Sequence, residues 1–406
     1  MEKIKDIFNQ YKGLNRGIYI IFIARIVNTI GSFVFPLLSL MLTQRFNLST
    51  TRAGAYITLM SILSGLAMMV GGKIADSLGR KKVIIIFQGL AALVYIICGN
   101  LDMNMYLIYL LMLSPIFNAL AQPAQSAMIM DLVEPEKRKE AFSLLYMGHN
   151  LGYAIGPLLA GVLYYRNKIS LIFIGDGVTT VVSLLLLLIF VKETINNDQK
   201  EIVDGNRVLE KKVEGSVFSV LLKRPVLIYF ALILFMYQFS YSQWTFALPL
   251  QLGDIFDVQG GKYYGILNAI NALIVIGLTP FIVKATKKLA PVYVMSLGGF
   301  FYAIAFGSLA FFKVMPLFVV SVIILTIGEI GISINASTFA ANNSPASHRG
   351  RLDATIQIIF GLGYALGPLA MGKIINIWSF KIGWIFIFFI MIIASICMLL
   401  LDRKIN

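Results

Sequence analysis

The chain has 406 residues, of which 58% are hydrophobic and 13% charged, and its mean hydropathy is +0.82. Soluble domains average about 45–50% apolar and about 25% charged residues, so this composition excludes a soluble globular protein. A membrane β-barrel is excluded as well, because stretches such as Val181–Val191 are apolar at every position but Ser183 and do not alternate. The sequence therefore predicts an all-α protein that crosses the lipid bilayer many times.

The formal charge of +14 reports membrane orientation and not an acidic partner, and we expect no nucleic acid to bind. With the N-terminus in the cytoplasm, 25 of the 34 Lys and Arg residues fall in cytoplasmic segments. This bias predicts that both termini are cytoplasmic. The chain has two cysteines and no organellar targeting segment, which is typical of a bacterial inner (cell) membrane protein.

The apolar runs predict twelve transmembrane helices in two groups of six, separated by one long polar segment. The first six are expected at 17–43, 53–72, 83–99, 105–130, 141–164 and 169–191. The second six are expected at 225–251, 262–284, 291–312, 316–340, 352–374 and 382–401. The predicted organisation is therefore a six-helix bundle over 1–191, a cytoplasmic linker over 192–224 and a second six-helix bundle over 225–406.

An internal repeat relates the two groups. The segment Leu151–Gly161, with sequence LGYAIGPLLAG, recurs 211 residues later as Leu362–Gly372, with sequence LGYALGPLAMG. Eight of the eleven positions are identical, and each copy lies in the fifth expected helix of its group. The two groups are therefore parallel repeats, an arrangement in which transporters place the substrate site near the bilayer midplane between the repeats.

A signature motif follows the second expected helix. Its fixed positions are Gly72, Asp76, Gly79, Arg80 and Lys81. The motif resembles the signature of the major facilitator superfamily between its second and third helices, which implies a twelve-helix transporter fold. In the family, the acidic residue faces a helix N-terminus or an Arg across the two halves and latches the cytoplasmic gate. The alternative is that the basic residues only set membrane orientation.

The repeated segment itself carries Gly152, Gly156, Pro157 and Gly161. It resembles the fifth-helix signature of proton-coupled drug antiporters, with Ala160 in place of one glycine, and this resemblance points to export. The alternative is close helix packing with no bearing on direction, because the same motif recurs in the eleventh expected helix. Many of these antiporters also carry an Arg in the fourth helix, where this chain has none, so any proton coupling must use other residues.

Few Asp, Glu, Lys or Arg residues lie well inside the expected spans. They are Asp176 and Glu329 among the acidic residues and Arg25 among the basic ones. A charge near the bilayer centre costs at least about 2.5–3.5 kcal/mol, so such groups usually face a cavity or each other. Arg25 and Glu329 are expected at the same depth, and the resemblance implies that they face the central cavity. Asp176 is a second candidate for proton coupling, with contact to external water as its alternative. His149 is a third candidate, and ordinary packing is its alternative.

Amide and aromatic side chains mark the expected cavity faces of the first, fourth, seventh and eighth spans. They are Asn28, Asn118, Gln122, Gln125, Tyr237, Gln238, Tyr241, Trp244, Asn268 and Asn271. Aromatic walls with scattered amides and one carboxylate suit lipophilic or cationic molecules. The alternative is that the amides join helices and the aromatic residues pack.

These observations predict a secondary transporter that exports small amphipathic or lipophilic compounds, cations included, in exchange for protons, with Glu329 as the proton carrier. One alternative is a symporter or facilitator for a polar nutrient or organic ion, and another is a transport-inactive membrane sensor. We expect a monomer and not an enzyme, with no cofactor and no metal site, because phosphate-binding, metal-ligand and nucleophile motifs are absent from the sequence.

Overall fold

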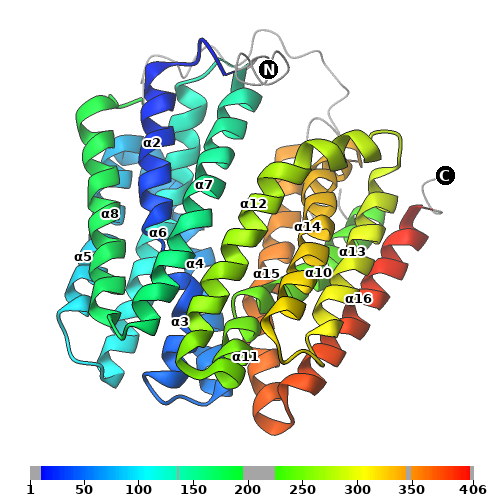
Figure 1. Ribbon diagram of the computed structural model, residues 1–406. Coiled ribbons are helices and arrows are strands. Elements are labelled where there is room, and N and C mark those ends of the chain that lie inside the picture. Colours follow the sequence, from blue (N-terminus) through cyan, green and yellow to red (C-terminus); the bar gives the residue numbers. More distant parts are fainter. Residues whose placement is uncertain (1–10, 135–136, 195–224, 344–348, 403–406) are drawn as a thin grey trace. The chain divides into compact units, whose positions relative to one another are not determined.

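The computed structural model describes residues 11–134, 137–194, 225–343 and 349–402 (Figure 1). Every regular element in these ranges is helical, which confirms the predicted all-α class. The first group comprises α2 (Arg16–Ile30), α3 (Val34–Gln44), α4 (Thr50–Leu78), α5 (Arg80–Gly99), α6 (Met105–Asp131), α7 (Arg138–Tyr165) and α8 (Ile169–Phe190). The second comprises α10 (Pro225–Tyr241), η3 (Ser242–Trp244), α11 (Ala247–Phe256), η4 (Asp257–Gln259), α12 (Gly260–Thr286), α13 (Pro291–Ser308), α14 (Met315–Asn343), α15 (Arg349–Ile377) and α16 (Phe380–Asp402). Of the predicted linker, residues 195–224 lie outside the described ranges.

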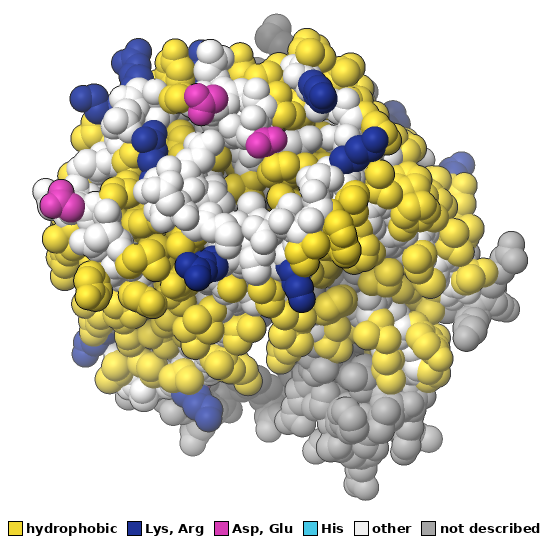
Figure 2. Space-filling model, turned by 90° about the horizontal axis from the view of Figure 1, so that it is seen from below, with side chains coloured by type: hydrophobic (Ala, Val, Ile, Leu, Met, Phe, Trp, Pro, Cys, Tyr) yellow, Lys and Arg dark blue, Asp and Glu magenta, His cyan; other side chains and the backbone are white. Residues whose placement is uncertain are grey.

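Ten stretches of the described chain are long and apolar enough to cross a membrane. One of them, Pro225–Thr286, contains both the α10–α11 segment and α12, and α7 is not among the ten. Many large apolar side chains are also exposed, including Met69, Phe281 and Phe389 at 57–70%. On the face drawn in Figure 2, hydrophobic side chains cover much of the surface, and the charged side chains are few and scattered. A surface of this kind is stable against lipid and not against water, so the chain is an integral membrane protein.

The first spanning segment of each group is broken, and the two breaks occupy equivalent places. α2 ends at Ile30, and α10 ends at Tyr241, which is 211 residues later, the same offset as the sequence repeat. The following helices each carry a proline at their third residue, Pro36 in α3 and Pro249 in α11. Proline lacks an N–H and is tolerated in a first helical turn, where that N–H would have no partner, whereas inside a helix it removes one backbone hydrogen bond. We call residues 31–33 the first break and residues 242–246 the second break.

The chain forms two compact units that differ from the predicted halves by an exchange of segments. The first unit contains residues 1–41, 60–203 and 258–272, and the second contains 42–59, 204–257 and 273–406. The start of α4 therefore groups with α15, and the start of α12 groups with α7. The helix pairs of the first half, α5 with α6 and α8 and α2 with α7 and α8, pack within the first unit, as α13 with α14 and α16 pack within the second (Figure 1).

The exchange follows from two close helix crossings that the repeated motif creates. In the first unit, a Cβ added at Gly265 of α12 would overlap the carbonyl oxygen of Pro157 in α7. In the second unit, a Cβ added at Gly54 of α4 would overlap the carbonyl oxygen of Pro368 in α15. Gly54 and Gly265 are themselves 211 residues apart, so the two crossings are equivalent. Small residues let the backbones touch, and the touching backbones join each helix pair into one unit.

The crossings predict opposite effects for alanine substitutions within one helix. Gly54→Ala and Gly265→Ala should each destabilise this conformation by about 1–3 kcal/mol, because the added methyl group meets a backbone carbonyl that cannot rotate away. Gly65→Ala in α4 and Gly277→Ala in α12 are the matched controls, since nothing lies within 4 Å of a Cβ at either position. We expect the controls to be neutral or stabilising, because alanine is the better helix former.

The midpoint of thermal unfolding in one detergent, measured for all four variants beside the wild type, provides the test. Equal effects at Gly54 and Gly265 and at the two control glycines would show that the close crossings do not stabilise the unit in which each lies.

Candidate functional site

The signature motif lies at a sharp turn between α4 and α5. Gly79 occupies this turn with φ of +100°, a backbone conformation that residues with a side chain rarely adopt. Gly72 lies one helical turn before Asp76 and is partly buried near Pro123 of α6. Gly79 therefore sets the direction in which α5 leaves, and so positions the charged residues that follow it.

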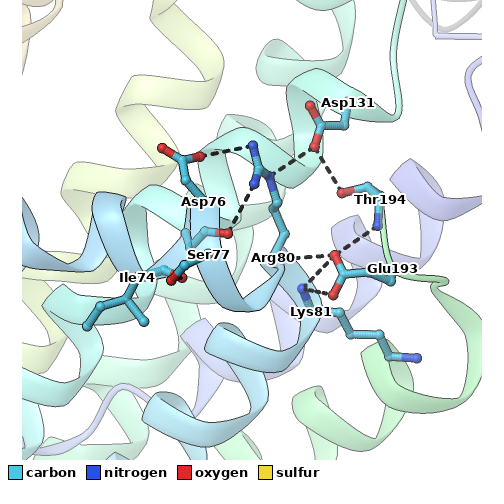
Figure 3. A network of polar contacts seen from close by, with 9 residues as sticks. Ile74, Asp76, Ser77, Arg80, Lys81, Asp131, Glu193 and Thr194 are labelled. Atoms are coloured by element: carbon cyan, nitrogen blue, oxygen red, sulfur yellow. Dashed lines mark hydrogen bonds and ion pairs between the residues drawn. The ribbon is translucent and has the colours of Figure 1, made fainter. Parts of the chain in front are cut away.

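Arg80 is the centre of the polar network drawn in Figure 3. Its guanidinium group lies 3.2 Å from Asp76 and 3.3 Å from Asp131 at the end of α6, and it donates a hydrogen bond to the carbonyl oxygen of Ala75. The side chain of Asp76 is 75% exposed, whereas that of Asp131 is 32% exposed. Exposed ion pairs contribute little, so Asp131 is the stronger partner of Arg80. The predicted contact of Asp76 with the opposite half stays a prediction.

Residues that follow α8 complete this network. The carboxylate of Glu193 accepts hydrogen bonds from the backbone N–H groups of Arg80 at 2.9 Å and Lys81 at 3.1 Å, as Figure 3 shows. Gly79 has no side chain to cap α5, so a carboxylate from elsewhere satisfies the free N–H groups and opposes the positive end of the helix. Thr194 donates to Asp131 at 3.0 Å, and Lys81 donates to the carbonyl oxygen of Leu188. Glu193 and Thr194, at the start of the predicted linker, thus bind to the signature motif and its partner Asp131 through hydrogen bonds.

Sequence reasoning did not find Asp131, Glu193 or Thr194. Each is polar and stands just beyond a long apolar run, so each looks like an ordinary residue at a membrane border. Their role appears only when α6 and α8 end at the same level as the turn between α4 and α5.

Glu329 lies on α14 in the second unit and meets the second break. The hydroxyl of Tyr241, the last residue of α10, donates a hydrogen bond to Oε1 of Glu329 at 2.8 Å. The Tyr241 ring stacks on that of Tyr302 from α13, with 5.9 Å between centroids and an interplanar angle of 14°. Tyr302 is buried, whereas Glu329 and Tyr241 are partly exposed. The structure therefore joins a predicted proton carrier to a predicted cavity aromatic residue at the point where the helix is interrupted.

Arg25 and His149 lie near each other in the first unit. Thr29 donates to the carbonyl oxygen of Arg25 at 2.7 Å, and its hydroxyl lies 3.5 Å from Nδ1 of His149. The His149 ring stacks on Tyr153 with 5.8 Å between centroids. Glu329 belongs to the other unit, so the expectation that it and Arg25 face one central cavity stays a prediction.

Asp176 is buried, with 9% of its surface exposed, so the alternative that it only meets external water is wrong. Its Oδ2 atom accepts hydrogen bonds from the backbone N–H groups of Phe33 at 3.0 Å and Val34 at 3.1 Å. These groups lie at the first break, where α3 begins. The Phe33 N–H also donates to the carbonyl oxygen of Gly31 at 2.7 Å, so it is shared between two acceptors. A carboxylate from α8 thus accepts from backbone donors at the interruption, including the N–H of the first residue of α3.

The predicted cavity residues divide into two sets. Four are buried in helix packing: Tyr237 (1% exposed), Trp244 (3%), Asn268 (0%) and Asn271 (8%). Tyr237 donates to the carbonyl oxygen of Met295, and Asn268 donates to that of Tyr264, one turn earlier. Asn28 is partly buried and joins two helices through a hydrogen bond to Thr180 at 2.9 Å. For these residues the packing alternative describes this conformation better than a cavity role does. The other five predicted cavity residues also keep exposed surface: Tyr241, Gln238, Asn118, Gln122 and Gln125.

The fifth-helix motif uses its glycines against two different neighbours. A Cβ at Gly152 would lie 2.6 Å from the Cβ of Thr29, and one at Gly156 would lie 2.7 Å from the carbonyl oxygen of Thr29. Gly161, further along α7, faces the start of α12. The motif therefore holds α7 against α2 just before the first break. In the part of the chain that the structure describes, no group of His, Cys, Asp and Glu could hold a metal ion.

Comparisons with known proteins agree with this architecture. The family model described as "Major Facilitator Superfamily" matches residues 21–352 and again 262–405. A "Na(+), Li(+), K(+)/H(+) antiporter" of Planococcus maritimus is 26% identical over 396 residues, covering 89% of each chain. "Multidrug resistance protein MdtH" of Salmonella typhimurium is 30% identical over 150 residues, covering 37% of each chain.

Among solved structures, a "peptide transporter POT" superposes with a TM-score of 0.79 at 15% identity, over 96% of this chain and 95% of that one. The "nucleoside transporter NupG" superposes with a TM-score of 0.75 at 14% identity, over 95% of this chain and all of that one. At this identity the likeness shows the fold alone, and it confirms the predicted major facilitator fold. The chain belongs to the Major Facilitator Superfamily of membrane transporters.

Proposed function

We propose that this transporter is a proton-coupled exporter of small amphipathic or lipophilic compounds, cations included, that works by alternating access. Twelve segments would cross the inner membrane, with α2–α3 and α10–α11 each counted as one, both termini in the cytoplasm, and a monomer as the working unit. The observation that carries the proposal is the hydrogen bond from Tyr241 to Glu329 at the second break.

Glu329 combines the properties that a proton carrier needs. It is a carboxylate inside an expected span and keeps part of its surface exposed, whereas Asp176 is buried and already accepts two backbone hydrogen bonds. A carboxylate at this depth is costly when it is charged, so it favours either a proton or a cation beside it. An arriving cationic substrate and a proton would therefore compete for Glu329, and this competition couples export to proton entry.

The aromatic surroundings favour an organic cargo. The stacked rings of Tyr241 and Tyr302 lie beside the carboxylate, so a lipophilic cation could contact an aromatic face and the charge together. The relative from Salmonella typhimurium named as a multidrug resistance protein supports this direction, although it aligns over 37% of the chain.

A second candidate is exchange of monovalent metal cations for protons. It is favoured by the relative from Planococcus maritimus, whose name states that activity and which aligns along 89% of both chains. The same carboxylate would serve, but a metal cation also needs several oxygen ligands to replace its water. The hydroxyl of Tyr241 supplies one. The predicted alternative of a nutrient symporter or facilitator is a third outcome that the same assay separates.

The test is transport by the purified protein in proteoliposomes under pH gradients of either sign. The panel would contain tetraphenylphosphonium, ethidium, Na⁺, K⁺, a dipeptide and a nucleoside. We expect proton-driven movement of the two organic cations against the direction of proton flow. Movement of Na⁺ or K⁺ alone would replace the proposal with the second candidate, and movement of a cargo in the direction of proton flow would make the protein a symporter.

Glu329→Gln should separate binding from coupling. Gln keeps the shape and can still accept the hydrogen bond from Tyr241, but it cannot exchange a proton. We expect at least tenfold slower transport under a pH gradient, binding retained, and downhill exchange partly intact. The matched control is Asp257→Asn, an exposed carboxylate at φ of +50°, where Asn is well tolerated. Normal proton dependence in Glu329→Gln would show that the carrier lies elsewhere.

The signature motif should act through Asp131 more than through Asp76. Asp131→Asn weakens the better shielded partner of Arg80 and alters the acceptor of Thr194 together, whereas Asp76→Asn alters one exposed ion pair. We therefore expect a several-fold lower initial transport rate for Asp131→Asn and a smaller loss for Asp76→Asn, at equal amounts of folded protein. The reverse order would mean that Asp76 acts through a partner other than Arg80, as its resemblance to the family signature predicts.

A further inference from the structure

The first break depends on a charged group from another helix. α3 begins at Val34, and the first N–H groups of a helix have no partner within that helix. Oδ2 of Asp176 accepts from both Phe33 and Val34, and these two residues are 7% and 2% exposed. The Phe33 N–H is shared with the carbonyl oxygen of Gly31, so Val34 depends on the carboxylate more than Phe33 does. Water therefore has little access to replace the carboxylate. Its negative charge also opposes the positive end of α3, which adds to the two hydrogen bonds.

The backbone around Asp176 is shaped for this contact. A Cβ at Gly175 would lie 2.7 Å from the ring of Phe33, and one at Gly31 would overlap the hydroxyl of Thr179. On the other side of α8, a Cβ at Gly177 would lie 2.6 Å from the side chain of Ile96 in α5. Glycines thus bring α8 against both the first break and α5, which fixes the position of the carboxylate.

The carboxylate has no cationic partner in the described ranges. No described Lys, Arg or His forms an ion pair with Asp176. Among the helices packed on α8, α5 presents Tyr95, which interacts with Asp176 electrostatically and has Cys98 beside it. α2 carries Arg25 and α7 carries His149, and these two interact with each other. The charge is therefore stabilised mainly by the two backbone N–H groups and the end of α3.

The second break is held in a different way. The position equivalent to Asp176 by the 211-residue offset is Ile387, which is fully buried in α16 and offers no hydrogen-bond acceptor. Instead, the amide nitrogen of Gln243 donates to the carbonyl oxygen of Phe239 at 2.9 Å and to the hydroxyl of Ser242 at 3.0 Å. These groups are neutral at any physiological pH. A proton can therefore change the first break and not these contacts of the second.

We propose that Asp176 is a proton-dependent positioning residue that keeps the first spanning segment broken while it is ionised. A proton on the carboxylate would remove the charge that opposes the end of α3 and would weaken acceptance from Phe33 and Val34. α3 would then be free to change its angle to α2. This would give the first half a proton site of its own, separate from Glu329, and it goes beyond the proposed function because it concerns helix geometry and needs no cargo.

The test is hydrogen–deuterium exchange of the full chain in nanodiscs, measured at several pH values and corrected for the intrinsic exchange rate. Peptides that contain Phe33 and Val34 should exchange about tenfold faster when the pH falls, the size expected for one hydrogen bond to a charged group. In Glu329→Gln, where the partner of the Tyr241 hydroxyl cannot take up a proton, peptides across residues 240–248 should not change with pH, and they serve as the internal control. Exchange at the first break that does not depend on pH in the wild type would overturn the proposal.

Three variants place the effect on Asp176. Asp176→Asn should exchange fast at the first break at every pH, Asp176→Glu should restore a pH-dependent exchange, and Glu329→Gln should behave as the wild type does. If Asp176→Asn does not fold, the pH dependence of exchange at the first break in the wild type and in Glu329→Gln still tests the proposal. Loss of the pH dependence in Glu329→Gln would assign it to the other half and overturn the role of Asp176. Failure of the proposed export, by contrast, would leave the exchange result unchanged.

Discussion

A bilayer offers no water to the backbone, so every N–H and C=O group within it must find a partner in the protein. The described chain meets this constraint with helices, and it departs from them inside the membrane at the two breaks. Each break leaves backbone N–H or C=O groups without a partner in the helix, and polar side chains form hydrogen bonds with such groups there. Asp176 does so at the first break, and Gln243 does so at the second. Charged and polar groups are thus concentrated where the helices are interrupted, which is where a transporter can use them.

The repeat provides a symmetric frame, whereas the charges are placed asymmetrically. The breaks, the glycine crossings and the proline-containing motifs all recur at an offset of 211 residues. The ionisable residues do not. The positions equivalent to Glu329, Asp176 and Arg25 are held by Asn118, Ile387 and Met236. Packing was therefore retained in both copies, while chemistry was built separately in each. A division of this kind lets one frame carry different cargoes, because the frame does not depend on the residues of the site.

Much of the fold could be predicted from the sequence because the signals are strong and local. Long apolar runs, basic residues at their borders and an eight-in-eleven repeat require no knowledge of tertiary contacts. The breaks were missed, since a proline such as Pro36 within an apolar run does not show whether a helix kinks or starts again. The exchange of segments between the units was missed as well. A single glycine such as Gly54 shows that a neighbour can approach closely, but not which neighbour it is.

The candidate site was predictable in its chemistry and less so in its geometry. The cost of charge in a membrane singles out Glu329 and Asp176 from the sequence alone. Helical periodicity then tells which residues share a face, but not which faces are covered, so Tyr237, Trp244 and Asn268 were expected in a cavity and are buried.

The two carboxylates differ in a way that only their partners reveal. The partner of Glu329 is the side-chain hydroxyl of Tyr241, which can rotate without moving the backbone of α10. The partners of Asp176 are backbone groups, which cannot turn away without moving α3. On our proposals, a proton on Glu329 would therefore compete with a ligand, whereas a proton on Asp176 would allow α3 to move.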